Sequence, residues 1–222
     1  MDKKTFVITG ANRGLGDSLV ELLLTERNIF VISLSRKINQ KQLDYPSSIF
    51  RHIECDLLES NLKIKLKELN SLIGNEEVYF INNANIIEPI SRVEDFSEKS
   101  FDEILTINIK SPVIISQFLL NNFKDNKINF INISSGSSKT PMSNWSLYCS
   151  TKSFMEMFFN VLKTENNRHE VISLDPGAMD TDMQKYIRKI NFPDSNNFNN
   201  LFKKGKLKST EESAKRILEQ IL

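Results

Sequence analysis

A tyrosine and a lysine four residues apart, with a serine upstream, are the residues of this chain best suited to chemistry. On a helix, Tyr148 and Lys152 would face the same side one turn apart, and Ser135 lies thirteen residues before Tyr148. A free phenol ionises near pH ~10, and a neighbouring ammonium favours the phenolate, so we expect Lys152 to lower the pKa of Tyr148. A Ser135 hydroxyl beside the phenol could orient a carbonyl group. Together the three residues predict a proton donor for a carbonyl.

Taken alone, a Tyr-x-x-x-Lys pair is commonly a half-buried ring beside a solvated charge, so its meaning depends on the elements that position it. Short, almost continuously apolar runs alternate with amphipathic segments along the whole chain. This alternation predicts an α/β protein with a three-layer Rossmann fold, a doubly wound parallel sheet of about six strands in a single domain, 1–222. We expect strands at 5–9, 29–34, 49–54, 77–81, 127–133 and 170–174, and helices at 15–26, 60–72, 98–123, 147–166 and 210–221. Pro112 should bend the helix at 98–123 near its middle.

One segment departs from this alternation. Residues 191–208 are rich in Asn, Phe and Lys, which is a shift in composition. The segment is either a lid over a site or a plain surface connection, and we favour a substrate-side lid spanning 182–208.

A glycine-rich turn directly follows the first strand and opens the first helix. Gly10 permits a tight turn, Gly14 lets the backbone approach a pyrophosphate, and Gly16 allows close packing of helix on strand. The helix N-terminus supplies free N–H groups and partial positive charge for phosphates. The alternative, a glycine turn without a ligand, fits this context less well. The turn predicts a dinucleotide site that includes Gly10, Asn12, Arg13, Gly14, Leu15 and Gly16.

The end of the second strand selects the dinucleotide. An NAD site usually places a carboxylate there for the ribose 2′-hydroxyl, whereas this strand ends in Ser35-Arg36. Arg13 and Arg36 could give a 2′-phosphate charge-assisted hydrogen bonds, so we predict NADP(H). Asp56, next to Leu57 after the third strand, could bind the adenine amino group.

Composition excludes several classes of protein. The 222 residues carry a formal net charge of +1, so no basic surface for nucleic acid or an anionic membrane is expected. The longest apolar runs, such as 112–115, are too short to cross a bilayer, and the strand-like run at 5–9 starts too early for a signal peptide. Cys55 and Cys149 have no metal or redox spacing and indicate reduced thiols in a cytoplasmic protein. No metal site is predicted.

These motifs in this order resemble the short-chain dehydrogenase/reductase family over nearly the whole chain. Asn82-Asn83-Ala84 resembles the family's strand-end element that lines the cofactor. The resemblance implies a catalytic set of Asn108, Ser135, Tyr148 and Lys152. It also implies nicotinamide contacts from the loop at 176–181, through Pro176, Gly177, Met179 and Thr181. The cofactor residues then also include Ser35, Arg36, Asp56, Leu57, Asn83, Ala84, Tyr148 and Lys152.

Two stretches, 145–152 and 175–184, are similar to the sepiapterin reductase and benzil reductase branch, whose members reduce ketones and diketones with NADPH. The resemblance implies that Tyr148 protonates the developing alkoxide, Lys152 holds the nicotinamide ribose, and Asn108 anchors a water in a proton relay. Trp145 and Met183 could form a pocket wall for a small-molecule carbonyl substrate, or could be ordinary packing residues. We expect Ser135 rather than Ser134 to face the site, because adjacent strand residues point to opposite faces.

The chain departs from the family pattern at two places. Asn85 replaces a family glycine. Asn is the non-glycine residue best able to adopt a left-handed conformation, so we expect the turn to be kept in that conformation, although the side chain could crowd the cofactor. A C-terminal seventh strand is missing, which favours a monomer or homodimer over the family's usual tetramer. Two other functions stay open: a 3-oxoacyl or alcohol dehydrogenase of the same family, and an NADP(H)-binding sensor without turnover.

Overall fold

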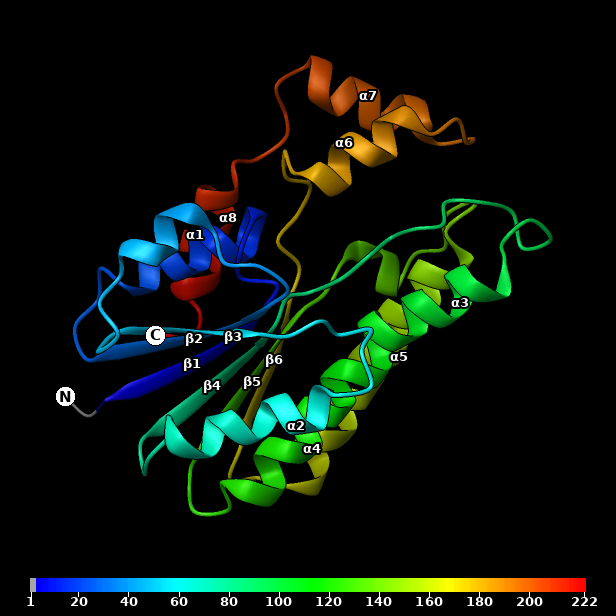
Figure 1. Cartoon of the computed structure of the whole chain (residues 1–222). Helices are drawn as coiled ribbons and strands as arrows, with labels where there is room; N and C mark the ends of the chain where they lie inside the picture. Colours follow the sequence, from blue (N-terminus) through cyan, green and yellow to red (C-terminus); the bar gives the residue numbers. More distant parts are fainter. Residues whose placement is uncertain (1–2) are drawn as a thin grey trace.

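Six parallel strands form the central sheet of the computed structural model, which describes residues 3–222 (Figure 1). The strands are β1 (Lys4–Thr9), β2 (Ile29–Ser35), β3 (Phe50–Glu54), β4 (Glu77–Asn82), β5 (Ile128–Ile133) and β6 (Glu170–Leu174). Their order is β3-β2-β1-β4-β5-β6, so the connection from β3 to β4 crosses back over the sheet. The predicted doubly wound parallel sheet is confirmed, with every strand boundary within one residue of expectation. The prediction of no signal peptide rests partly on residues 1 and 2, which lie outside the described residues.

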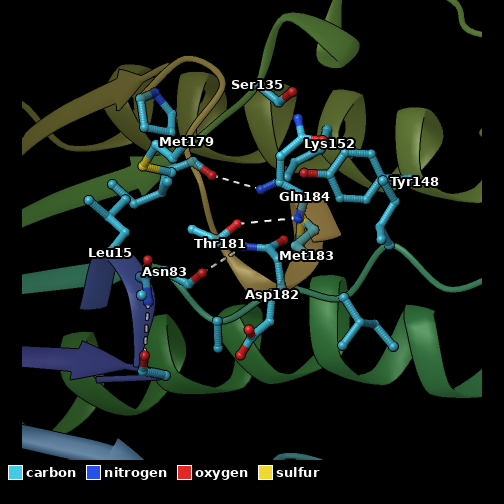
Figure 2. Close-up of a pocket in the computed structure, with 18 of the residues that line it drawn as sticks. Leu15, Asn83, Ser135, Tyr148, Lys152, Met179, Thr181, Asp182, Met183 and Gln184 are labelled. Carbon is cyan, nitrogen blue, oxygen red and sulfur yellow. Dashed lines mark hydrogen bonds between the residues drawn. The ribbon is translucent and has the colours of Figure 1, made fainter. Parts of the chain in front are cut away.

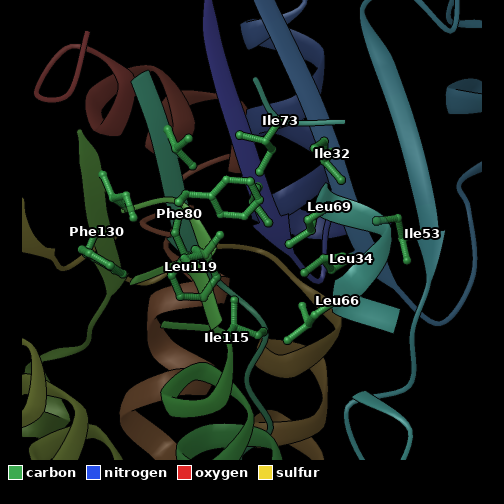
Figure 3. Packing of buried hydrophobic residues seen from close by; sticks show 14 of the residues in the cluster. Ile32, Leu34, Ile53, Leu66, Leu69, Ile73, Phe80, Ile115, Leu119 and Phe130 are labelled. Atoms are coloured by element: carbon green, nitrogen blue, oxygen red, sulfur yellow. The ribbon is translucent and has the colours of Figure 1, made fainter. Parts of the chain in front are cut away.

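Helices cover both faces of the sheet. On one face lie α1 (Gly14–Leu23) and α8 (Thr210–Leu218), and on the other lie α2 (Leu62–Leu66), α4 (Ser111–Asn122) and α5 (Ser146–Glu165) (Figure 1). The apolar strands therefore bury side chains on both faces, as parallel sheets require. Figure 3 shows Phe80 and Phe130 from the sheet meeting Ile115 and Leu119 from α4, and all four are fully buried or nearly so.

The predicted helix at 98–123 is continuous but irregular. It consists of α3 (Glu98–Leu105), a π-helical turn at Thr106–Lys110, and α4. The irregularity lies directly before Pro112, and the predicted bend of the helix axis stays a prediction. Pro112 has no N–H for the carbonyl of Asn108, and the Ser111 hydroxyl donates to the Thr106 carbonyl at 2.8 Å.

By length and composition, the continuous helix Glu98–Asn122 could cross a membrane, which the short apolar runs did not indicate. In the fold, its residues Ile104, Ile115 and Leu119 are fully buried in the protein core. One or two such helices are weak evidence of a membrane span, and core packing accounts for this one.

The segment 182–208 is largely helical, which the sequence did not predict. It contains α6 (Asp182–Lys189) and α7 (Ser195–Lys203), which stand apart from the three layers (Figure 1). The Arg188 guanidinium lies 4.1 Å from the centre of the Phe202 ring and joins the two helices. Met179 pairs with Lys208 as an isolated parallel bridge, so both ends of the segment are held together. Its role as a lid stays a prediction.

Two other local predictions need correction. The helix expected at 60–72 is the short α2 followed by a 3₁₀ turn at Lys67–Ser71, and a further 3₁₀ turn spans Gln40–Asp44. Asn85 does not adopt a left-handed conformation, since Asn28 and Asn144 are the non-glycine residues with positive φ in the described chain. Its side chain instead donates to the carbonyl of Asn83 at 3.1 Å, so the turn closes without a glycine at this position.

Candidate active site

A cavity of about 690 Å³ opens at the carboxyl ends of the strands, beside the reversal of strand order between β1 and β4. It extends from the glycine turn past the end of β2 to Tyr148 and α6. Its lining includes nearly all the predicted cofactor residues: Gly10, Asn12, Arg13, Gly14, Leu15, Ser35, Arg36, Asp56, Leu57, Asn83, Ala84, Tyr148, Lys152, Pro176, Gly177, Met179 and Thr181. Gly16 and Asn108 lie outside this lining, and each supports it from behind.

The glycine turn is held against the end of β4. Gly10 has a φ of +64°, and a Cβ there would lie 3.1 Å from the Cα of Ala84. A Cβ at Gly16 would collide with the carbonyl oxygen of Gly10 and lie 2.7 Å from Nδ2 of Asn83. That same Nδ2 donates to the carbonyls of Thr9 at 2.9 Å and Gly10 at 3.2 Å. The turn is therefore fixed with the N-terminus of α1 facing the cavity, an arrangement that suits phosphate groups.

The two arginines predicted for a 2′-phosphate are in different situations. Nη1 of Arg13 pairs with Oδ2 of Asp182 at 3.3 Å, across from the glycine turn to the start of α6. Arg36 lines the cavity, is exposed, and makes no ion pair with the residues the structure describes. Ser35 is buried and donates to the carbonyl of Lys37 at 3.0 Å, which shapes the backbone at the strand end. Arg36 is therefore the more available cation.

Asp56 and Asn85 complete this part of the cavity wall. One carboxylate oxygen of Asp56 accepts the N–H of Leu58 at 3.0 Å, and this bond orients the side chain after β3. Leu57 is buried next to it. Asn85 lines the cavity directly, so its side chain narrows the space that a glycine would leave open.

The predicted catalytic residues Ser135, Tyr148 and Lys152 meet at the other end of the cavity (Figure 2). Tyr148 and Lys152 lie on α5, with the Lys152 ammonium 5.6 Å from the centre of the Tyr148 ring. Nζ of Lys152 donates to the carbonyl of Ile133 at 2.7 Å, so the lysine is anchored to the end of β5. Ser135 follows that strand, and its Oγ accepts hydrogen bonds from the N–H and the hydroxyl of Ser137.

Burial dominates the electrostatics of this group. It raises the pKa of Tyr148 strongly, while the hydrogen bond with Ser135 opposes the rise and the charge of Asp175 adds to it. Burial also lowers the pKa of Lys152 to about 7, against the opposing charges of Asp175 and Glu156. The predicted lowering of the Tyr148 pKa by Lys152 is therefore wrong for this structure. Desolvation of a phenolate at this buried position is the largest effect on the pKa of Tyr148, so the phenol keeps its proton at neutral pH.

Ser134 and Ser135 have different hydrogen-bond partners, but both line the cavity, so the prediction that only Ser135 faces the site is wrong. Both residues follow the end of β5, where strand alternation no longer applies. The Ser134 hydroxyl donates to a carboxylate oxygen of Glu156 at 2.6 Å. Glu156 lies one turn after Lys152 on α5, which places its negative charge behind the lysine. Asp175 accepts the N–H of Gly177 at 2.8 Å and stabilises the turn after β6.

Asn108 is buried behind the cavity, and its side chain is fully engaged. Its Oδ1 accepts the N–H of Ile86 at 2.9 Å, and its Nδ2 donates to the carbonyl of Ile86 at 2.8 Å and to Oγ1 of Thr151 at 3.1 Å. Thr151 immediately precedes Lys152. Asn108 therefore ties the loop after β4 to the helix that carries Tyr148 and Lys152.

Aromatic and sulfur-containing side chains surround Tyr148 on the side of α6. Trp145 is 5% exposed, with its ring centre 5.6 Å from that of Tyr148 and 5.3 Å from that of Phe198 on α7. Met183 also lines the cavity and packs against the same cluster, so both alternatives considered for it apply. Ile187 and Phe198 line the cavity as well, on two helices that the sequence did not predict. The apolar spacing of Met183 and Ile187 could have indicated Ile187, but no local pattern indicated Phe198.

The described residues contain no group of three or more His, Cys, Asp or Glu side chains that could hold a metal ion. Cys55 and Cys149 are free thiols.

Comparisons with known proteins agree on the family. The model of the short chain dehydrogenases matches residues 4–191. The benzil reductase ((S)-benzoin forming) of Bacillus cereus is 34% identical, over 95% of this chain and 91% of its own length. The sepiapterin reductase of Bos taurus is 30% identical, over 96% of this chain and 87% of its own. The crystal structure of the KRED1-Pglu enzyme superposes with a TM-score of 0.87 at 26% identity, covering 96% of this chain and 92% of that one.

Proposed function

This chain belongs to the short-chain dehydrogenase family, and on that premise we propose that it is an NADPH-dependent reductase of ketones and diketones. It is an oxidoreductase related to carbonyl reductases, and the family uses NAD(P)H. The observation that supports the finer proposal is the convergence of Ser135, Tyr148 and Lys152 on one end of a cavity whose other end is the glycine turn.

The residues present fit a dinucleotide. Gly10 and Gly16 let the turn pack tightly against the end of β4, where a Cβ would collide, and the N-terminus of α1 faces the cavity. Arg36, supported by Arg13, would hold a 2′-phosphate, and Thr181 and the turn at 176–179 would hold the nicotinamide. When bound, the reduced nicotinamide supplies the hydride.

The side chains around Tyr148 account for the proton. Burial keeps the phenol protonated at neutral pH, which is the form needed to protonate the developing alkoxide. The Ser135 hydroxyl is positioned to donate a hydrogen bond to the same oxygen, an interaction that strengthens as negative charge develops. Lys152 would supply positive charge beside the phenol as the proton leaves. Asn108 would act through Thr151 by fixing the position of α5.

A Tyr148→Phe variant tests this assignment. It removes the hydroxyl but keeps the ring, so we expect kcat to fall by at least about 100-fold, as for loss of a general acid. NADPH affinity, measured by fluorescence titration, should stay within about threefold of wild type. Tyr45→Phe, outside the cavity, is the matched control. Near-full reductase activity in Tyr148→Phe would refute the assignment.

Two other functions are separated by the same assays. A panel of diketones, 3-oxoacyl thioesters and simple alcohols would distinguish a carbonyl reductase from another dehydrogenase of the family. Binding of NADPH without turnover of any of them would favour a sensor.

We also propose a cytoplasmic location and a homodimer.

A further inference from the structure

Gln184 is a buried amide in the wall of the cavity with an unsatisfied polar atom. The side chain is 5% exposed, and its Oε1 makes no hydrogen bond within the part of the chain that the structure describes. Gln184 lines the same cavity as Tyr148 and Lys152, and Figure 2 shows it in their part of the site. A buried amide oxygen without a partner is costly, so its presence needs an explanation.

Helix capping does not provide that explanation. Thr181-x-x-Gln184 has the sequence of a capping box, in which the Gln side chain would accept the N–H of the N-cap residue. Thr181 is the N-cap of α6, and its hydroxyl accepts the N–H of Gln184 at 3.4 Å. The N–H of Thr181, however, donates to the carbonyl of Met179 at 3.0 Å. The reciprocal half of the box is therefore not formed, and the amide is left for another partner.

The surroundings of Gln184 are otherwise apolar or aromatic on the side of α6. Trp145, Met183, Ile187 and Phe198 line this part of the cavity. A ligand seated among them would bury hydrocarbon or an aromatic ring against these side chains and could meet the amide with one polar atom. Because a side-chain amide carries a donor and an acceptor that exchange when it is turned over, it can serve a carbonyl or a hydroxyl oxygen.

We infer that Gln184 is a specificity-determining residue that binds a second oxygen next to the carbonyl being reduced. This inference rests on the proposed function. It narrows the substrate class to carbonyl compounds with an adjacent carbonyl or hydroxyl group and an aromatic or bulky apolar substituent. Tyr148 and Ser135 serve the reacting oxygen, and Gln184 serves its neighbour.

A pair of ketones that differ only in the second oxygen tests the inference. Benzil has two adjacent carbonyls between two phenyl rings, and deoxybenzoin has a methylene in place of one carbonyl. We compare kcat/KM for both in the wild type and in Gln184→Met, which keeps length but loses the amide. The ratio between the ketones should fall by about 10-fold in the variant, as for one lost hydrogen bond. Using the change in this ratio cancels the higher intrinsic reactivity of the diketone.

Two controls keep the result interpretable. Met183→Leu alters the same wall without removing a polar group and should leave the ratio unchanged, and Gln184→Leu repeats the test with another shape. NADPH affinity should stay at the wild-type value in all three variants. Where reduction of deoxybenzoin is too slow to measure, its inhibition constant replaces kcat/KM.

An unchanged ratio in both Gln184 variants would overturn the role of Gln184 alone. Absence of any ketone reduction by the wild type would instead overturn the proposed function.

Discussion

Replacing Lys152 with methionine should stabilise the protein while removing its activity. Lys152 is 3% exposed, and burial lowers its pKa to about 7 from an ordinary value near 10.5. Keeping it charged in the folded protein therefore costs roughly 4–5 kcal/mol at neutral pH. Methionine removes this cost but leaves the carbonyl of Ile133 without its donor, which costs about 1–3 kcal/mol. The net gain should be about 2 kcal/mol, or roughly 4–8 °C in Tm.

The pH dependence of the stability difference between Lys152→Met and the wild type identifies the buried ammonium as its cause. The pKa of Lys152 is lower in the folded protein than in the unfolded chain. Between these two values the unfolded chain therefore binds more protons, and the free energy of unfolding of the wild type rises with pH. The destabilisation by Lys152 is complete below about pH 7 and disappears as the pH approaches 10.5. The advantage of Lys152→Met should therefore be largest at pH 6–7 and shrink towards pH 10.

Urea unfolding at pH 6, 8 and 9.5 measures this difference. Lys163→Met, an exposed position on the same helix, is the control and should change the free energy of unfolding by no more than about 0.5 kcal/mol at any pH. A stability difference for Lys152→Met that does not vary with pH would refute the claim that a buried ammonium is responsible. A destabilised Lys152→Met at pH 6 would show that the hydrogen bond to Ile133 outweighs desolvation.

Three further perturbations test other parts of the site. Gly16→Ala places a Cβ against the carbonyl of Gly10, so it should cost more than about 3 kcal/mol in urea unfolding or abolish NADPH binding; wild-type values for both would contradict this packing. Arg36→Ser should raise KM for NADPH at least about 10-fold and leave KM for NADH nearly unchanged; equal effects on both cofactors would argue against a 2′-phosphate contact. An exposed apolar stripe on α5 consists of Phe154, Met157 and Val161. Met157→Lys should therefore convert the proposed homodimer to a monomer in light scattering. A dimer that survives this substitution would place the interface elsewhere.

Elements with a strong local signal could be predicted from the sequence. The six strands are almost continuously apolar because both faces of the sheet are covered, and this pattern needs no knowledge of the neighbours. The glycine turn was also predictable, because its glycines stand between a strand and a helix in the sequence itself. The structure adds the contacts with Asn83 and Ala84 that leave no room for a Cβ. The Tyr-x-x-x-Lys spacing places two side chains on one helix face in any fold.

Features that depend on distant residues could not be predicted. The helices α6 and α7 are polar in sequence and are packed through contacts such as Arg188 on Phe202. Sequence spacing also gave no sign that Arg13 would pair with Asp182, which lies 169 residues away.

In the active site, too, some properties follow from the sequence and others depend on residues that are distant in the chain. The amino-acid sequence alone specifies which groups are present: the phenol of Tyr148, the ammonium of Lys152 and the hydroxyl of Ser135. It also specifies that Tyr148 and Lys152 share a helix face. Only the tertiary structure decided their protonation, since the depth of burial reverses the shift expected for Tyr148 and brings the pKa of Lys152 to about 7. It also decided that the amide of Gln184 is left without a partner beside them. Desolvation and hydrogen-bond satisfaction depend on every atom packed around a group, and residues far apart in the chain supply most of those atoms.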